Sequence, residues 1–347
     1  MTHWNKIKVL TQLVRRAYEA HQDTGQYHTS AQKLWFEKLA LLDSLEVASL
    51  PESLHKKMRW YMVDCRFLGE LLAQLVSKPL DDKAVELIML VAVMGAVSDL
   101  MVDEMRVSSQ EIQHILMESE QPSPTASVIE RIFFIFRDCA YKLISFESKS
   151  LILAYGKTAT KAQIDSSEQL ESGKTLQQIE KIAYDKGGLA AVLIGCVVTP
   201  DFVKIAKPVY DVGGLIQLLN DAQDMHKDCR ENIVTFVRFQ ATFSDIAHYL
   251  DKERQRIFAQ FQHLPYPKKG VEQFVFSMTL LQLGVLFKLY GYKKACNNDL
   301  NFNKIALMPK DTFRISPFSG KALWLFFREI YRFRLRTAHE AMTLDMF

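Results

Sequence analysis

The sequence has few of the residues that stabilise small or secreted domains covalently. Its 347 residues include five cysteines, an odd number at wide spacings, with no CxxC pair. This pattern excludes a disulfide framework and a zinc knuckle and is typical of reduced thiols in a cytoplasmic protein. With 48% hydrophobic residues, the chain is long enough to bury a substantial core without cross-links.

An excess of one charge and a long apolar run are also missing. Lys and Arg total 43 against 40 Asp and Glu, and the basic residues are scattered, so we expect no nucleic-acid partner. The most apolar run, Leu87–Val97, is far shorter than the roughly 20 residues that cross a bilayer. The first residues lack the apolar core and cleavage site of a secretory signal. We therefore expect no stable membrane span.

Short motifs of several large enzyme classes are absent as well. The sequence contains no GxSxG, no GxxxxGK[ST], no GxGxxG and no HExxH. Serine hydrolases, P-loop nucleotide hydrolases, dinucleotide-binding enzymes and HExxH metalloproteases therefore have no support.

Apolar residues recur at helical spacing along nearly the whole chain, whereas alternating runs bounded by turn residues are scarce. We therefore predict an all-α fold. Because no polar break separates apolar segments of different character, we predict one domain over residues 1–347. Polar breaks are predicted at Glu118–Thr125, Gly156–Gly173 and Lys293–Ser319. The predicted helices are Trp4–Gln22, Ser30–Leu42, Ser53–Leu75, Lys83–Leu116, Ser127–Leu153, Thr175–Val198, Phe202–Ala206, Val212–Phe239, Phe243–Gln262, Val271–Tyr290 and Gly320–Ala341.

A first acidic cluster, Ser98–Glu104, follows directly after the apolar run. On a helix, Asp99 and Asp103 lie on one face, separated by about 40 degrees around the axis. Two carboxylates beside a buried surface are costly unless a cation neutralises them, and a divalent metal would do so. Such a pair is also typical of an ordinary solvated helix face.

The second acidic cluster, Gln217–Asp228, is more specific. Asn220, Asp224 and Asp228 recur every four residues, so on a continuous helix three oxygen ligands form a strip along one side. Oxygen ligands of this kind suit Mg²⁺, which completes its shell with water and substrate phosphates. Lys227 is next to Asp228 in the sequence and is placed to bind the same substrate phosphates.

These residues resemble motifs of the class I isoprenoid synthase superfamily, which includes trans-prenyl diphosphate synthases and class I terpene cyclases. The stretch Gly214–Asp224 resembles the second aspartate-rich region of the prenyl synthases, with Asn220 in place of its first aspartate. Read in the cyclase register, Asn220 to Asp228 is similar to the NDxxSxxKE metal motif of bacterial cyclases. It departs from that motif by Asp224 in the serine position and Asp228 in the glutamate position.

The first cluster is similar to the DDxxD motif of the same superfamily, with Leu100 where the second aspartate is common. Asp99 and Asp103 are the positions that match. The second cluster follows roughly 120 residues later, a spacing that lets two helices of a bundle face each other across one cavity. The resemblance covers about Lys83–Arg238, and the remainder agrees in length and helicity alone.

The resemblance implies a single large helical bundle with a central cavity, in which Asp99, Asp103, Asn220, Asp224 and Asp228 bind about three Mg²⁺ ions. Lys186 with the two glycines that follow it resembles the lysine-glycine region before the second metal helix, where the glycines would let the helix approach a ligand or a neighbouring element closely. A capped helix with a surface lysine explains the sequence equally well. The basic residues expected on the substrate diphosphate are Lys186, Lys227, Arg314 and Arg332.

The activity that this implies is Mg²⁺-dependent ionisation of a linear allylic prenyl diphosphate, followed by carbocation cyclisation. We place a terpene cyclase first because the second cluster extends to Lys227 and Asp228 and the first lacks the full aspartate set. A prenyltransferase that elongates or couples prenyl chains is the alternative within the superfamily. A helical interaction protein with acidic surface patches is the non-enzymatic alternative. Related bundles often pair, so a homodimer is an expectation too.

Overall fold

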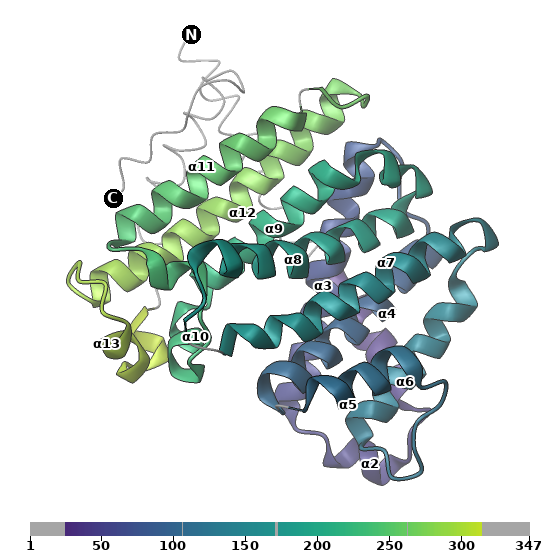
Figure 1. Cartoon of the computed structure of the whole chain (residues 1–347). Helices are drawn as coiled ribbons and strands as arrows, with labels where there is room; N and C mark the ends of the chain where they lie inside the picture. Colours follow the sequence, from purple (N-terminus) through teal and green to yellow (C-terminus); the bar gives the residue numbers. More distant parts are fainter. Residues whose placement is uncertain (1–24, 106, 171–172, 262, 314–347) are drawn as a thin grey trace. The chain divides into compact units, whose positions relative to one another are not determined.

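The structure is a computed structural model, and it describes residues 25–105, 107–170, 173–261 and 263–313 (Figure 1). Throughout these residues the regular elements are helices, and none is a strand. The prediction of an all-α fold is therefore confirmed. The predicted helices Trp4–Gln22 and Gly320–Ala341 lie outside the described residues.

The chain divides into two compact units, each of which is described by itself. The first unit consists of Met1–Gln74, Lys78–Ser167 and Val192–Lys204, and the second of Leu75–Ser77, Glu168–Ala191 and Ile205–Phe347. Helix α8, Leu176–Val198, contributes its residues up to Ala191 to the second unit and the rest to the first. The single domain and the central cavity stay predictions.

The first unit is built around α4. Most side chains between Leu87 and Val97 are buried, as expected for a helix that is apolar on all sides, and α4 packs against α6 and α7. The Asp81 carboxylate caps α4 by accepting the Ala84 N–H. The elements are a helical segment over residues 25–39, α2 Ser44–Ser49, α3 Glu52–Leu75, α4 Asp82–Asp99, η1 Leu100–Glu104, α5 Ser109–Gln113, η2 His114–Glu118, α6 Val128–Leu143 and α7 Phe146–Asp165.

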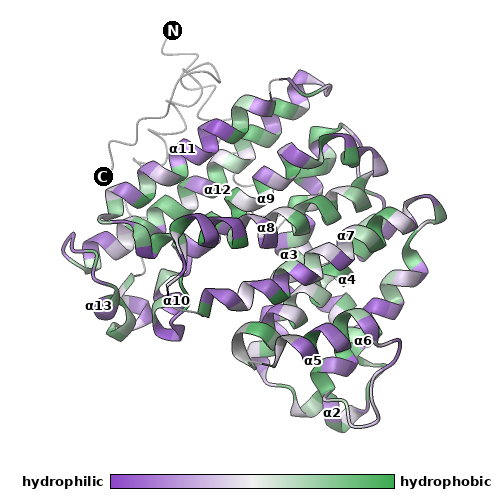
Figure 2. Ribbon diagram, viewed as in Figure 1, coloured by the Kyte–Doolittle hydropathy of each residue, from purple (hydrophilic) through white to green (hydrophobic). Residues whose placement is uncertain are grey.

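The second unit packs α9 against α11 and α12, and α11 against α12. Helix α11 carries both hydrophobic and hydrophilic residues (Figure 2), and its buried side chains recur at three- and four-residue spacing, so one face is buried. Phe261 and Phe274 stack where α11 meets α12, with ring centroids 5.0 Å apart. Its elements after α8 are α9 Ala206–Gln223, α10 Met225–Glu231, η5 Phe236–Phe239, α11 Phe243–Phe261, α12 Lys268–Ala295, α13 Phe302–Leu307 and η6 Lys310–Phe313.

Two short 3-10 helices connect these elements, η3 Ser166–Leu170 and η4 Pro200–Ile205. All five cysteines lie within the described residues, and none forms a disulfide. By length and composition alone, Asp82–Val102 and Lys268–Ala295 are apolar enough to cross a membrane. In the most apolar window of each, 72% and 61% of the residues are buried, as is also usual for core helices of folded proteins.

Several predicted helices were wrong in their interior. Ser127–Leu153 is two helices: α6 ends at Leu143, and Ser145 caps the start of α7 by accepting the Ser148 N–H. The break predicted at Gly156–Gly173 is helical up to Asp165, since one glycine and a set of polar side chains do not stop a helix that contains no proline.

The predicted helix Lys83–Leu116 also differs. After Asp99 the helix continues as the π-helical turn η1, in which the Met105 N–H bonds to the Leu100 carbonyl at 2.9 Å. A second π-helical turn, η2, follows α5. Turns of this kind are rare and frequently found at functional sites.

Candidate functional site

Of the predicted site residues of the second unit, Lys186 lies next to the place where α8 crosses α9, and four glycines set the distance between the two helices. A Cβ on Gly187 would lie 2.3 Å from the Gly213 carbonyl oxygen and 2.7 Å from the Gln217 Cβ. Gly188 lies against the Tyr210 ring, and Gly214 lies equally close to a tyrosine ring of α8. The two backbones therefore touch, which is the close approach to a neighbouring helix that the Lys-Gly-Gly sequence predicted.

One turn beyond this crossing, α9 buries the carboxylate of Asp221. The side chain is 4% exposed, and Oδ1 accepts a hydrogen bond from Gln217 Nε2 at 2.8 Å. Within the described part of the chain, Oδ2 is buried without any hydrogen-bond partner. Burial raises the pKa of Asp221 to about 7, against the lowering effects of the Gln217 hydrogen bond and the nearby Lys186 ammonium. An orphaned buried carboxylate oxygen is uncommon and marks a place where a cation would be stabilised.

The sequence reasoning placed Asn220, Asp224 and Asp228 on one continuous strip, and this geometry was wrong. Asn220 is exposed, whereas Asp228 is 8% exposed. The helix bends at Asp224, with φ −94° and ψ 12°, so α9 ends at Gln223 and α10 begins at Met225. The position that faces inward beside Asp228 is Asp221, which the four-residue spacing passed over.

The carboxylates of Asp221, Asp224 and Asp228, called the α9–α10 carboxylates below, lie within electrostatic range of one another. Burial, and then the negative charges of Asp221 and Asp224, raise the pKa of Asp228 to about 9. The ammonium of Lys227 opposes this increase. A bound cation would offset the repulsion between these carboxylates and lower the pKa values of Asp221 and Asp228.

Two predicted diphosphate ligands, Lys186 and Lys227, are described in this unit. Lys186 is half-buried on α8, directly before the glycine crossing, and its charge acts on Asp221. Lys227 lies on α10, with Nζ 3.8 Å from Glu231, and its charge acts on Asp228. Both lysines therefore adjoin the α9–α10 carboxylates. Arg314 and Arg332 lie outside the described residues.

In the first unit, Asp99 is buried at the end of α4, and donors of the same unit surround its carboxylate. Lys57 Nζ lies 3.1 Å and the Tyr61 hydroxyl 2.7 Å from Oδ2, and Gln163 Nε2 lies 3.4 Å from Oδ1. Sequence reasoning missed these three partners, because α3 and α7 carry them far away in the chain. Asp103 lies in η1, and its side chain is outside the described part.

The residues of the two units differ in how well they fit a magnesium ion. Among the described side chains, no three of His, Cys, Asp or Glu are grouped so that they alone could hold a metal. Mg²⁺, however, is commonly held by one or two carboxylates together with water and phosphate. One or two of the α9–α10 carboxylates, the orphaned Asp221 oxygen among them, fit that role. Asp99 fits it less well because Lys57 already neutralises its charge.

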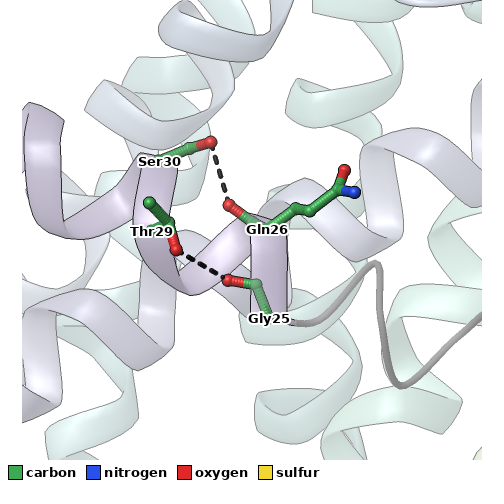
Figure 3. A pocket seen from close by; sticks show the side chains of 4 residues that line it. All are labelled: Gly25, Gln26, Thr29 and Ser30. Atoms are coloured by element: carbon green, nitrogen blue, oxygen red, sulfur yellow. Dashed lines mark hydrogen bonds between the residues drawn. The ribbon is translucent and has the colours of Figure 1, made fainter.

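A shallow hollow in the first unit is formed by Gly25, Gln26, Thr29 and Ser30 (Figure 3). The hydroxyls of Thr29 and Ser30 each bond to a backbone carbonyl one turn earlier, at 3.0 Å. These four residues include no ionisable side chain. We therefore assign no chemistry to this hollow.

Comparisons with known proteins give little. No family model and no curated protein matches the chain. A structure of a geranyltransferase from Legionella pneumophila is similar to this chain with a TM-score of 0.45 and 14% sequence identity. The match covers 76% of this chain and 96% of the other. A similarity at this level gives no information about function.

Proposed function

We propose that this chain is a class I isoprenoid synthase, which ionises an allylic prenyl diphosphate with the help of magnesium. The observation that carries the proposal is the Asp221 carboxylate, buried with one oxygen unpartnered beside Asp224, Asp228 and Lys186. Oxygen ligands next to a lysine match the chemistry of a metal-bound diphosphate.

In this proposal the α9–α10 carboxylates hold the magnesium and do not react with the substrate. Bound magnesium supplies positive charge that stabilises the departing diphosphate. Lys186 and Lys227 bind diphosphate oxygens, and their charges compensate the carboxylates so that an anion can approach. Lys186 directly precedes the glycine crossing and its charge acts on Asp221, so the positive and negative groups lie near each other before substrate binds.

Within this class we favour a terpene cyclase that acts on farnesyl, geranylgeranyl or a longer prenyl diphosphate. Its support is the continuation of the carboxylates beyond the bend to Asp228, as in the cyclase register of the motif. A prenyltransferase is the second candidate, and a different observation favours it. Asp221, at the second aspartate of the prenyl synthase motif, is buried near Lys186, whereas Asn220 is exposed.

Product analysis distinguishes the two candidates. The purified protein is incubated with Mg²⁺ and geranyl, farnesyl, geranylgeranyl or geranylfarnesyl diphosphate, each with and without isopentenyl diphosphate. A hydrocarbon or alcohol made from one substrate alone supports the cyclase. Longer diphosphates that form only with isopentenyl diphosphate support the prenyltransferase.

A pair of matched variants connects the product to the site. Asp221→Asn should abolish the product, whereas Asp201→Asn, on an exposed residue paired with Lys204, should leave it unchanged. The proposal is wrong if no substrate is consumed and if magnesium with inorganic pyrophosphate does not raise the thermal stability of the wild-type protein.

A further inference from the structure

The bend between α9 and α10 is bonded to a side chain from α12. The Tyr292 hydroxyl donates to the Gln223 carbonyl at 3.1 Å and accepts the His226 N–H at 3.2 Å. These two backbone groups flank Asp224, the residue at which the helix direction changes. One hydroxyl therefore connects the last residue of α9 to the second residue of α10.

The tyrosine and the bend are held from a second side as well. The Tyr292 ring is 2% exposed and packs against Phe313 of η6, with centroids 4.5 Å apart. The His226 ring packs against the same phenylalanine at 5.3 Å, and its Nε2 lies 2.8 Å from the Met308 carbonyl oxygen. The bend is thus fixed by α12 together with the segment that contains α13 and η6.

The bend lies between the residues that carry the α9–α10 carboxylates. Asp221 precedes it on α9, Asp224 is the bend itself, and Asp228 follows it on α10. The angle between α9 and α10 therefore sets where Asp228 lies relative to Asp221. A magnesium ion tolerates little deviation from octahedral geometry, so an altered angle costs metal affinity.

We propose that Tyr292 is a positioning residue for the metal site, whose hydroxyl fixes the α9–α10 bend and thereby the α9–α10 carboxylates. This inference rests on the proposed function for its metal and on the hydrogen bonds above for its geometry. Tyr292 itself touches neither metal nor substrate. It acts through the backbone at Gln223 and His226.

The test removes the hydroxyl and keeps the ring. Tyr292→Phe keeps the packing on Phe313 but removes the hydrogen bonds to the Gln223 carbonyl and from the His226 N–H. Tyr249→Phe is the matched control, because the Tyr249 hydroxyl also takes part in hydrogen bonding, donating to Glu180 at 2.6 Å, elsewhere in the same unit. Both variants lose one tyrosine hydroxyl, and only one of them loses contact with the bend.

Two readouts are taken on the full-length protein. Amide hydrogen exchange without metal should become about tenfold faster across Met225–Glu231 in Tyr292→Phe and stay unchanged there in Tyr249→Phe. The dissociation constant of Mg²⁺ in the presence of inorganic pyrophosphate, measured by titration calorimetry, should increase about tenfold in Tyr292→Phe alone.

The outcomes separate this inference from the proposed function. If the wild-type protein binds magnesium and Tyr292→Phe changes neither exchange nor affinity, the positioning role is wrong and the function stands. If exchange accelerates but magnesium does not bind even to the wild type, the hydroxyl fixes the bend but the metal role and the proposed function both fail. If both tyrosine variants weaken magnesium binding equally, the effect is general destabilisation and the inference is refuted.

Discussion

Replacing Gly187 by alanine would place a methyl group where α8 and α9 already touch. Its Cβ would lie 2.3 Å from the Gly213 oxygen, whereas an ordinary contact begins at 3.4 Å, so the helices would have to separate by about 1 Å. Neither atom that it meets is the end of a flexible side chain. We expect a packing cost near the upper end of about 1–3 kcal/mol. The higher helix propensity of alanine offsets about 1 kcal/mol of this cost, so the unfolding free energy should fall by about 2 kcal/mol.

Gly284→Ala is the matched control. Gly284 lies in the interior of α12 in the same unit and is exposed, and none of the described residues has an atom within 4 Å of an added Cβ there. The same substitution should therefore stabilise the protein by up to about 1 kcal/mol. Urea unfolding of both variants, compared by their midpoints at equal slope, gives the two free-energy changes. The reasoning is refuted if the two variants shift stability in the same direction.

Three further perturbations follow from buried polar groups. Lys57→Met removes the charge that neutralises Asp99 and should lower the unfolding free energy by about 2 kcal/mol. In a double-mutant cycle measured by urea unfolding, adding Asp99→Asn should recover most of this loss, and additive losses would contradict the pairing. Burial raises the pKa of Asp221 from its ordinary value of 3.8 to about 7. Without magnesium, the folded state therefore keeps a proton that the unfolded state releases, and the wild-type protein loses stability as the pH rises between these values. Asp221→Asn should therefore gain stability relative to the wild type, by up to about 4 kcal/mol between pH 4 and 7, and a difference independent of pH would refute this. Gln282 is buried and both of its amide atoms lack a partner among the described residues, so Gln282→Met should raise the unfolding free energy by about 1–3 kcal/mol. A lower unfolding free energy in urea would show that the amide has a partner.

The all-α class and most helix positions were predictable because helical periodicity is a local signal. The first residues of α4 and α6 were predictable, because Asp81 and Ser127 are typical N-cap residues. The bend at Asp224 had no such signal. No proline or glycine marks it, and it is held by Tyr292, which lies 68 residues later in the chain.

The candidate site was predictable in its region and less so in its members. The composition of residues 217–228 located the acidic cluster, and the paired glycines predicted a close approach of α8. The assumption of one continuous helix selected Asn220 over Asp221, because the burial of a side chain depends on neighbouring helices rather than on spacing alone. The partners of Asp99 come from α3 and α7, and no local pattern links Lys57 or Gln163 to it.

The π-helical turn η1 has a consequence for changes in chain length. In this turn the Met105 N–H reaches five residues back to Leu100 rather than four. Deleting one residue within Leu100–Glu104 would allow ordinary four-residue bonding through the same stretch. We therefore expect the chain to lose a residue here more easily than within Leu87–Val97, where a deletion would rotate every later buried side chain of α4 by about 100 degrees. The turn is thus a point at which this helix accommodates insertions and deletions.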